Sequence, residues 1–229
     1  GCMVVGLNTR PIERASRVPF GTRNPNYEVL TKHLEEFEGA LTHMYLDPNG
    51  NVTIGVGHKL ESVEDAFSLN YESQPDDAAI RRDFEAVVRV GRLPNPEDYA
   101  AVTELRINEF EYLELLDRDM KEKLLELKGR FPRFSTYPEL VQRGMMDLVF
   151  NMGTAKFYGQ FTRFRRALKI RNWARVAAES RRSELDAKGN FLGGLARRND
   201  EVQGWFNQAA KANPYFVDPT CKVQVSRFM

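Results

Sequence analysis

Four polar side chains lie close together in one short stretch, EGALTHMYLDPNGNVTIGVGH (38–58): Glu38, Asp47, Thr53 and His58. Cleavage of a glycosidic bond needs one carboxylic acid to protonate the leaving oxygen and a second group to manage water or cation on the opposite face. Glu38 suits the first task, because partial burial at the end of an apolar helix favours a protonated carboxyl. Asp47 and Thr53 offer a carboxylate and a hydroxyl that can hold one water between them.

Each of these residues also has a simpler structural explanation. A Glu at a helix end is most often a solvated surface group, an Asp before Pro-Asn-Gly is a turn residue, and Thr is a common strand residue. The residue types alone leave both readings open, a reaction centre and an ordinary β-hairpin.

The spacing of these residues resembles that of the phage-type lysozymes, the family of the T-even phage endolysin. That family places its catalytic Glu, Asp and Thr in the register E-x8-D-x5-T. The residues that match the longer pattern are Glu38, Gly39, Tyr45, Asp47, Thr53, Ile54, Gly55, Gly57 and His58. Downstream, MMDLVFNMG (145–153) and LARRNDEV (195–202) resemble two helices of the family. The likeness covers roughly 27–60 and 103–208, and it is most specific in the first part.

The resemblance implies a role for each of the three residues. Glu38 would be the general acid, Asp47 would orient or deprotonate the water, and Thr53 would position that water. Family members of this type invert the anomeric centre, which predicts carboxyl groups about 6.5–9.5 Å apart.

Further site residues follow from the same resemblance. Asn151 would bind a sugar and Phe150 would line the groove or belong to the core. His58 would hydrogen-bond across the hairpin or contact substrate. Arg198, or in its place Arg197, would form an ion pair with the catalytic Glu.

The hydrophobic pattern predicts an α+β fold, with a small β-hairpin lobe, a larger helical lobe and a groove between them; the resemblance makes it lysozyme-like. We expect an extended arm over 1–26, a catalytic domain over 27–213 with an acidic helical insert at about 61–102, and a C-terminal tail over 214–229. Simple phage endolysins lack this insert, whereas bacterial lysozyme-like toxins, including type VI secretion effectors, carry similar ones. It could narrow access to substrate, dock a secretion carrier, bind an immunity protein or be a solvated elaboration.

Composition narrows the function classes. The 229 residues are 42% hydrophobic and 28% charged, with a net charge of +1, as in a soluble globular protein. No apolar run approaches the roughly 20 residues of a membrane span, and no signal peptide is visible. Residues 61–119 hold 16 Asp/Glu against 6 Lys/Arg, and residues 158–198 hold 11 Lys/Arg against 3 Asp/Glu. The basic segment is either a solvated face or a surface for an anionic polymer. Cys2 and Cys221 are either two unpaired thiols or a clasp between the ends.

The resemblance to the phage-type lysozymes implies a muramidase that cuts the β-1,4 bond between N-acetylmuramic acid and N-acetylglucosamine. Its partner would be bacterial peptidoglycan, and it would act at the cell wall, in the periplasm of the target or host cell, as an endolysin or an antibacterial effector. We expect no metal, since His33, His43 and His58 are scattered and form no ligand pattern with cysteines. We also expect no cofactor, no nucleic acid and no membrane insertion. A lytic transglycosylase and a non-catalytic wall-binding domain are the alternatives.

Overall fold

The computed structural model describes residues 25–186 and 188–214, in a mixed α+β fold that is mostly helical and has one small antiparallel sheet. The chain divides into two compact units between Gly129 and Arg130. We call the described residues up to 129 the hairpin unit and those from 130 the helical unit. Most of the arm expected over 1–26, the tail after 214, Cys2 and Cys221 lie outside the described residues.

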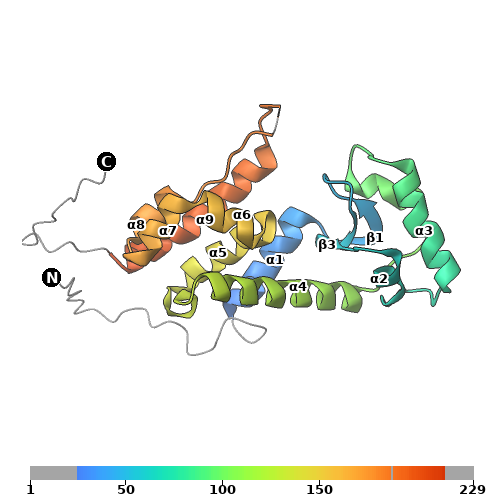
Figure 1. Ribbon diagram of the computed structural model, residues 1–229, viewed down its shortest axis with the longest axis horizontal. Coiled ribbons are helices and arrows are strands. Elements are labelled where there is room, and N and C mark those ends of the chain that lie inside the picture. Colours follow the sequence, from blue (N-terminus) through green and yellow to red (C-terminus); the bar gives the residue numbers. More distant parts are fainter. Residues whose placement is uncertain (1–24, 187, 215–229) are drawn as a thin grey trace, which may run out of the picture. The chain divides into compact units, whose positions relative to one another are not determined.

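The hairpin unit begins with one helix, continues with the sheet and ends with a long helix. Its elements are α1 (Pro25–Glu38), β1 (Leu41–Leu46), β2 (Val52–Gly55), β3 (His58–Lys59), α2 (Val63–Phe67), α3 (Asp77–Val90), the 3-10 helix η1 (Pro96–Ala101) and α4 (Glu109–Arg130), whose last residue belongs to the helical unit. The strands pair in the order β1-β2-β3, all antiparallel, with Tyr45 opposite Thr53. The predicted hairpin is confirmed, and a short third strand extends it (Figure 1).

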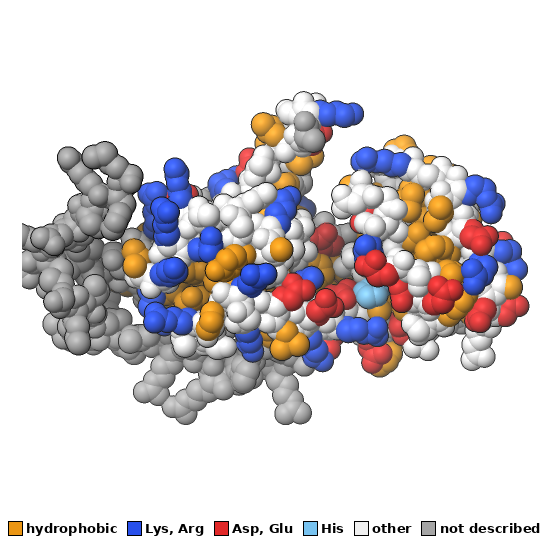
Figure 2. All heavy atoms as spheres, viewed as in Figure 1, with side chains coloured by type: hydrophobic (Ala, Val, Ile, Leu, Met, Phe, Trp, Pro, Cys, Tyr) orange, Lys and Arg blue, Asp and Glu red, His pale blue; other side chains and the backbone are white. Residues whose placement is uncertain are grey.

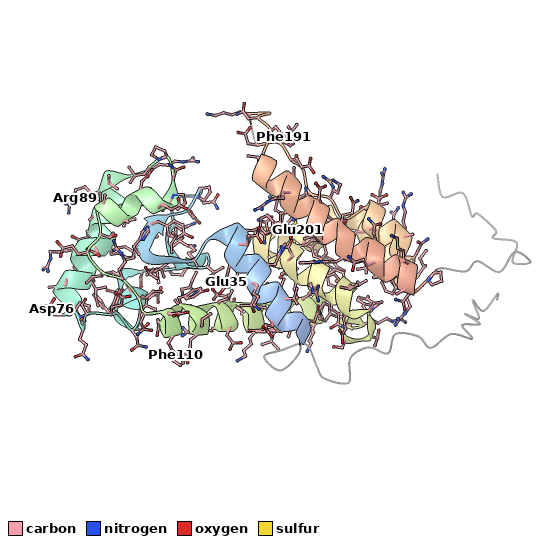
Figure 3. All side chains as sticks on the ribbon, turned by 180° about the vertical axis from the view of Figure 1, so that it is seen from behind. Glu35, Asp76, Arg89, Phe110, Phe191 and Glu201 are labelled. Atoms are coloured by element: carbon pink, nitrogen blue, oxygen red, sulfur yellow. The ribbon has the colours of Figure 1, made fainter. Side chains whose placement is uncertain are left out.

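Helix α1 delivers the chain to the start of the hairpin. Its apolar residues Leu30 and Leu34 are fully buried, as their spacing predicts. The hydroxyl of Tyr112 on α4 donates to the carboxylate of Glu35, which points towards α4 in Figure 3. The helix ends after Glu38 because the next residue, Gly39, has φ of +79°, a left-handed conformation that glycine adopts without steric cost.

The segment between the sheet and α4 is helical, as expected, and part of it packs on the sheet. Helix α3 contacts β1 and β2, and η1 contacts β1. Asp76, labelled in Figure 3, caps α3 by accepting a hydrogen bond of 2.7 Å from the backbone of Ala79. The buried carboxylate of Asp83 accepts backbone N–H groups of Glu104 (2.9 Å) and Leu105 (2.7 Å), which fixes α3 to the strand-like entry into α4.

The helical unit is built around one apolar helix. Its elements are the 3-10 helix η2 (Phe134–Thr136), α5 (Glu139–Met152), α6 (Thr154–Gln160), α7 (Thr162–Lys169), α8 (Trp173–Ala178) and α9 (Gly193–Ala212). Helix α5 is the central helix that its continuous apolar pattern predicts, with Met145, Leu148 and Val149 fully buried. It packs against α9, which also packs against α8.

The amphipathic stretch 160–182 is divided into two helices rather than continuing as one. Arg171 adopts φ of +55° between α7 and α8, a conformation that cannot continue a right-handed helix. The side chain of Asn172 then caps α8 by accepting from the backbone of Arg175 at 2.9 Å. Of the four apolar residues that the helical spacing predicts as anchors, Phe164, Leu168 and Trp173 are buried, whereas Phe161 is only half-buried.

The two units carry opposite charge. Residues 25–129 hold 23 Asp/Glu against 11 Lys/Arg, whereas residues 130–214 hold 16 Lys/Arg against 7 Asp/Glu. In the face shown in Figure 2, Lys and Arg side chains are prominent over the helical unit. The helices of residues 25–186 and 188–214 include none with the length and apolar character to cross a membrane.

Candidate functional site

Asp47 organises the turn between β1 and β2. Its Oδ1 accepts the backbone N–H groups of Asn49 and Asn51, both at 2.8 Å, and its Oδ2 accepts the side-chain amide of Asn51 at 2.9 Å. The backbone closes the same turn through Asp47 N–H to Asn51 O (2.9 Å) and Gly50 N–H to Asp47 O (3.0 Å). The DPNGN sequence explains this geometry, because Asp accepts local backbone donors and Gly50 supplies a φ of +83°.

These hydrogen bonds favour the ionised form of Asp47. Partial burial acts to raise the pKa of Asp47, but the hydrogen bonds from the Asn51 side chain and from the backbone of Asn51 and Asn49 outweigh it and hold the pKa below its ordinary value. A carboxylate has about four acceptor positions, and these three donors leave one for a further ligand such as water. Asp47 is therefore suited to stay charged and hold a water.

Thr53 lies on β2 with only 2% of its surface exposed. Its hydroxyl donates to the backbone carbonyl of Asn51 at 3.1 Å, which leaves the oxygen lone pairs as acceptors. Asn51 thus contacts both predicted water-binding residues: its side chain and N–H bind Asp47, and its carbonyl binds Thr53. The sequence pattern indicated no role for Asn51 beyond the turn DPNGN.

The pKa of Tyr45 is affected by both predicted catalytic carboxylates, Glu38 and Asp47. Its side chain is buried, and it lies opposite Thr53 in the β1–β2 ladder. Burial raises the pKa of Tyr45 first of all, and the negative charges of Glu38 and Asp47 raise it further, while a backbone hydrogen bond from Gly57 acts in the other direction. The negative charge of Glu97 also raises this pKa, so the phenol of Tyr45 senses three carboxylates of the hairpin unit.

Glu38 is the last residue of α1, two residues before β1 begins at position 41, and its side chain is half-buried. The structure therefore links Asp47 and Thr53 through Asn51 and places Glu38 at the end of the helix that leads into the same hairpin. The predicted gap of about 6.5–9.5 Å between the two carboxyl groups stays a prediction.

His58 is held by a residue that the sequence did not indicate. Its Nδ1 lies 2.9 Å from both carboxylate oxygens of Asp119 on α4, and both side chains are mostly buried, with 19% and 18% of their surface exposed. We expected His58 to hydrogen-bond across the hairpin, whereas this bond ties β3 to α4. A contact between His58 and substrate stays a prediction.

In the helical unit, Phe150 and Asn151 occupy the last turn of α5. Phe150 is half-buried and Asn151 is exposed. The Asn151 Oδ1 accepts a hydrogen bond of 3.1 Å from Arg182, which orients the amide and keeps its NH₂ group as a donor. This arrangement is compatible with sugar binding, and that role stays a prediction.

Arg198 is buried on α9 and binds Asp147 of α5, with Nε 2.7 Å from Oδ1. Arg182 binds the other oxygen of Asp147 at 3.0 Å. One fully buried carboxylate thus binds two buried guanidinium groups. The sequence singled out Arg198 but gave it Glu38 as a partner, and that pair stays a prediction. Arg197, its stated alternative, is exposed.

Metal chemistry has no ready set of ligands in the part of the chain that the structure describes. No group of three or more His, Cys, Asp or Glu side chains is placed there to hold a metal ion. The buried His33 and His43 lie elsewhere in the hairpin unit, and His43 Nε2 is 3.0 Å from the carbonyl oxygen of Pro96. Burial lowers the pKa of His43, so this imidazole stays neutral near pH 7.

No model of a known protein family matches the sequence, and no curated protein matches it. The chemistry of the site must therefore be argued from its own residues. An ionised carboxylate, a buried hydroxyl and a second, half-buried carboxyl around one hairpin can position a water and donate a proton. These are the requirements of acid-assisted hydrolysis.

Proposed function

We propose that this protein is a peptidoglycan hydrolase with a lysozyme-like fold, a muramidase that cleaves the β-1,4 bond between N-acetylmuramic acid and N-acetylglucosamine. Glu38 is the general acid. Asp47 and Thr53 hold the attacking water, and the reaction inverts the anomeric centre. The protein acts on the bacterial cell wall as an endolysin or an antibacterial effector, and Phe150, Asn151 and His58 contribute to substrate binding.

The observation that carries this proposal is the link through Asn51, which donates to Asp47 from its side chain and its N–H and accepts from Thr53 at its carbonyl. The negative charges of Glu38 and Asp47 also both raise the pKa of the buried Tyr45, in agreement with a shared site. The lowered pKa of Asp47 supports the charged role for this residue, and the spacing E-x8-D-x5-T in the sequence supports the assignment of Glu38 as the acid.

The hydrogen bonds at Asp47 and Thr53 favour hydrolysis over a lytic transglycosylase reaction. A transglycosylase needs a catalytic Glu but closes the sugar on its own hydroxyl, so it has no use for a held water. Here Asp47 and Thr53 are both bonded to Asn51, and each keeps an acceptor position to which a water can donate.

Digestion of purified peptidoglycan, followed by mass spectrometry of the fragments, tests the proposal. We expect muropeptides with reducing ends. The Glu38→Gln variant should lose at least about 100-fold in rate, because it removes the general acid. Glu36→Gln is the matched control, since Glu36 is an exposed carboxylate two residues earlier on the same helix.

Each other result has a definite meaning. Fragments with 1,6-anhydro ends would show that the protein is a lytic transglycosylase and not a hydrolase. Binding to the wall without release of fragments would leave a wall-binding domain. Full activity in Glu38→Gln, or equal losses in Glu38→Gln and Glu36→Gln, would refute the assignment of the acid.

A further inference from the structure

The helical unit contains a cavity of about 480 Å³ whose lining includes none of the residues of the proposed catalytic site. It is formed by the segment between α4 and η2, together with α6 and α7. Four cationic side chains line it, with two tyrosines: Arg130, Arg133, Arg165, Lys169, Tyr137 and Tyr158. Apolar side chains complete the wall. Its volume lies in the range of about 300–1,000 Å³ that is usual for small-ligand sites.

No carboxylate of residues 25–186 and 188–214 forms an ion pair with the cations of this cavity. Several other Arg side chains of the same unit do form such pairs. Four like charges around one space repel each other, and the walls of low dielectric strengthen the field between them. An anion that enters the cavity relieves this repulsion.

Two of the guanidinium groups are held in place by stacking. The Cζ of Arg165 is 4.0 Å from the ring centroid of Tyr158, and that of Arg130 is 5.3 Å from the same centroid. Within the described residues, the guanidinium of Arg165 donates no hydrogen bond. Cation–π contacts limit the rotamers of the two side chains without occupying their N–H donors. The donors are therefore positioned in advance for a ligand.

The number and kind of donors favour phosphate over carboxylate. A carboxylate brings one charge and two oxygens to four cations, whereas a phosphomonoester brings a charge of about −1.5 to −2 and three acceptor oxygens. Arginine binds such oxygens through paired N–H groups. The apolar part of the wall then suits a compact body that carries the phosphate.

The aromatic side chains do not favour nucleic acid. Bases stack on open aromatic faces in proteins that bind single strands. Here the ring of Tyr158 is covered by two guanidinium groups, and Tyr137 packs edge-on against Trp173 with a centroid distance of 5.6 Å. The cavity therefore fits one small phosphorylated molecule better than a strand of bases.

We propose that the cavity lined by Arg130, Arg133, Arg165 and Lys169 binds a phosphomonoester group carried on a small ring, with a sugar phosphate as the ligand class. The proposal concerns the helical unit alone and does not depend on hydrolysis of peptidoglycan. It gives a function to part of the basic segment that the sequence left open between a solvated face and a binding surface.

Calorimetric titration of the full chain with glucose 6-phosphate tests this proposal, with glucose, glucuronate, inorganic phosphate and duplex DNA as comparisons. We expect glucose 6-phosphate to bind most tightly and glucose not to bind. Binding should weaken as ionic strength rises from about 0.01 to about 0.15 M, since the Debye length falls from about 30 to about 8 Å.

Two variants separate the cavity from the general basic surface. Lys169 is exposed at the end of α7, and Lys169→Gln should weaken binding of glucose 6-phosphate about tenfold, the effect of losing one charged hydrogen bond. Arg166→Gln removes the same charge from the same helix outside the cavity and should leave binding within about twofold. Thermal unfolding of both variants shows that the fold is intact.

Several outcomes would overturn the proposal. Equal binding of glucuronate would assign the cavity to carboxylates. If inorganic phosphate binds as tightly as glucose 6-phosphate, the apolar wall does not contribute to binding of the ligand. If glucose 6-phosphate does not bind, the cavity is only part of a diffuse basic surface. The same conclusion follows if DNA binds and both Lys169→Gln and Arg166→Gln weaken its binding equally. The wall-digestion assay is a separate measurement, so either proposal can fail alone.

Discussion

Asp47 and Asp186 make the same set of hydrogen bonds in two different units of the chain. In each turn, Oδ1 accepts the backbone N–H groups of the residues two and four positions later at 2.8–2.9 Å, and Oδ2 accepts the Asn side chain four positions later at 2.9 Å. The shared sequence D-x-x-G-N, which is DPNGN at 47 and DAKGN at 186, explains the likeness. The turn itself is therefore no mark of catalysis. Asp47 differs from Asp186 in that its charge, together with that of Glu38, raises the pKa of the buried Tyr45.

Replacement of Asn51 by Ala should move the acid limb of the pH–activity profile to higher pH. The Asn51 side chain makes the hydrogen bond that contributes most to lowering the pKa of Asp47, so its removal raises that pKa towards the ordinary 3.8. A carboxylate whose pKa is lower in the folded than in the unfolded protein stabilises the fold at every pH above its ordinary pKa. This stabilisation is lost as the pH falls through the lowered pKa of the folded state. Rates of peptidoglycan digestion and thermal unfolding between about pH 7 and about pH 2 measure both effects.

Asn190→Ala is the matched control for that change. Hydrogen bonds from Asn190 lower the pKa of Asp186 in the same way, so the variant should alter unfolding in acid but not the pH dependence of activity. If Asn190→Ala shifts the activity profile as far as Asn51→Ala does, the shift comes from stability and Asp47 has no special role in the reaction.

Asp119→Ala should destabilise the hairpin unit and reduce activity. The change removes the partner of His58 at a mostly buried position, which costs about 1–3 kcal/mol of unfolding free energy. Glu122→Ala on the exposed face of α4 is the control and should stay within about 0.5 kcal/mol. Urea unfolding gives these values.

The same pair distinguishes support from substrate contact. If His58 only fixes β3 to α4, then His58→Ala, Asp119→Ala and the double variant lose activity by one common factor. A direct contact between His58 and substrate predicts a larger loss in His58→Ala, seen mainly in KM.

The parts of the fold that the sequence predicted depend on local rules. The hairpin follows from the turn residues DPNGN, and α5 follows from an apolar pattern on most of its faces. The division between α7 and α8 was not predicted, because Arg171 gives no sign in sequence of its positive φ. The intrinsic helix propensity of arginine is high, so it predicts that the helix continues through this position.

The site divides in the same way between local and distant interactions. Glu38, Asp47 and Thr53 lie within sixteen residues of one another, so spacing could indicate them. Asp119 is 61 positions from His58, and Asp147 is 51 positions from Arg198. Pairing of this kind arises from tertiary packing, which a single sequence does not display. The sequence D-x-x-G-N occurs at 47–51 and again at 186–190, and this repetition could have indicated that Asn51 binds the Asp four positions earlier.

Gly144→Ala should destabilise the helical unit by about 1–3 kcal/mol. A Cβ at this position of α5 would lie 2.4 Å from Cζ of Phe206, whose ring is fully buried on α9. The smaller side chain in Phe206→Leu should recover part of the loss in the double variant. Gly204→Ala is the opposite case, because its Cβ would meet no atom within 4 Å in the middle of α9, and it should stabilise by about 0.4–1 kcal/mol. Guanidinium unfolding midpoints that rank these variants differently would contradict the packing of α5 on α9.

Asp147→Asn should be the most destabilising of these changes, at about 3–5 kcal/mol. The carboxylate is fully buried between Arg182 and Arg198, and its loss leaves two buried cations without their negative partner. Asp200→Asn breaks an ion pair of the same length, 2.7 Å to Arg181, but that carboxylate is 70% exposed, so the cost should stay below about 1 kcal/mol.

Replacing Asp147, Arg182 and Arg198 together by apolar residues of similar volume should recover most of the stability, since the desolvation of charge is then removed. A loss below about 1 kcal/mol in Asp147→Asn, with unchanged denaturant dependence, would show that the buried cluster contributes little to the fold and would leave Arg198 available for the partner that the sequence suggested.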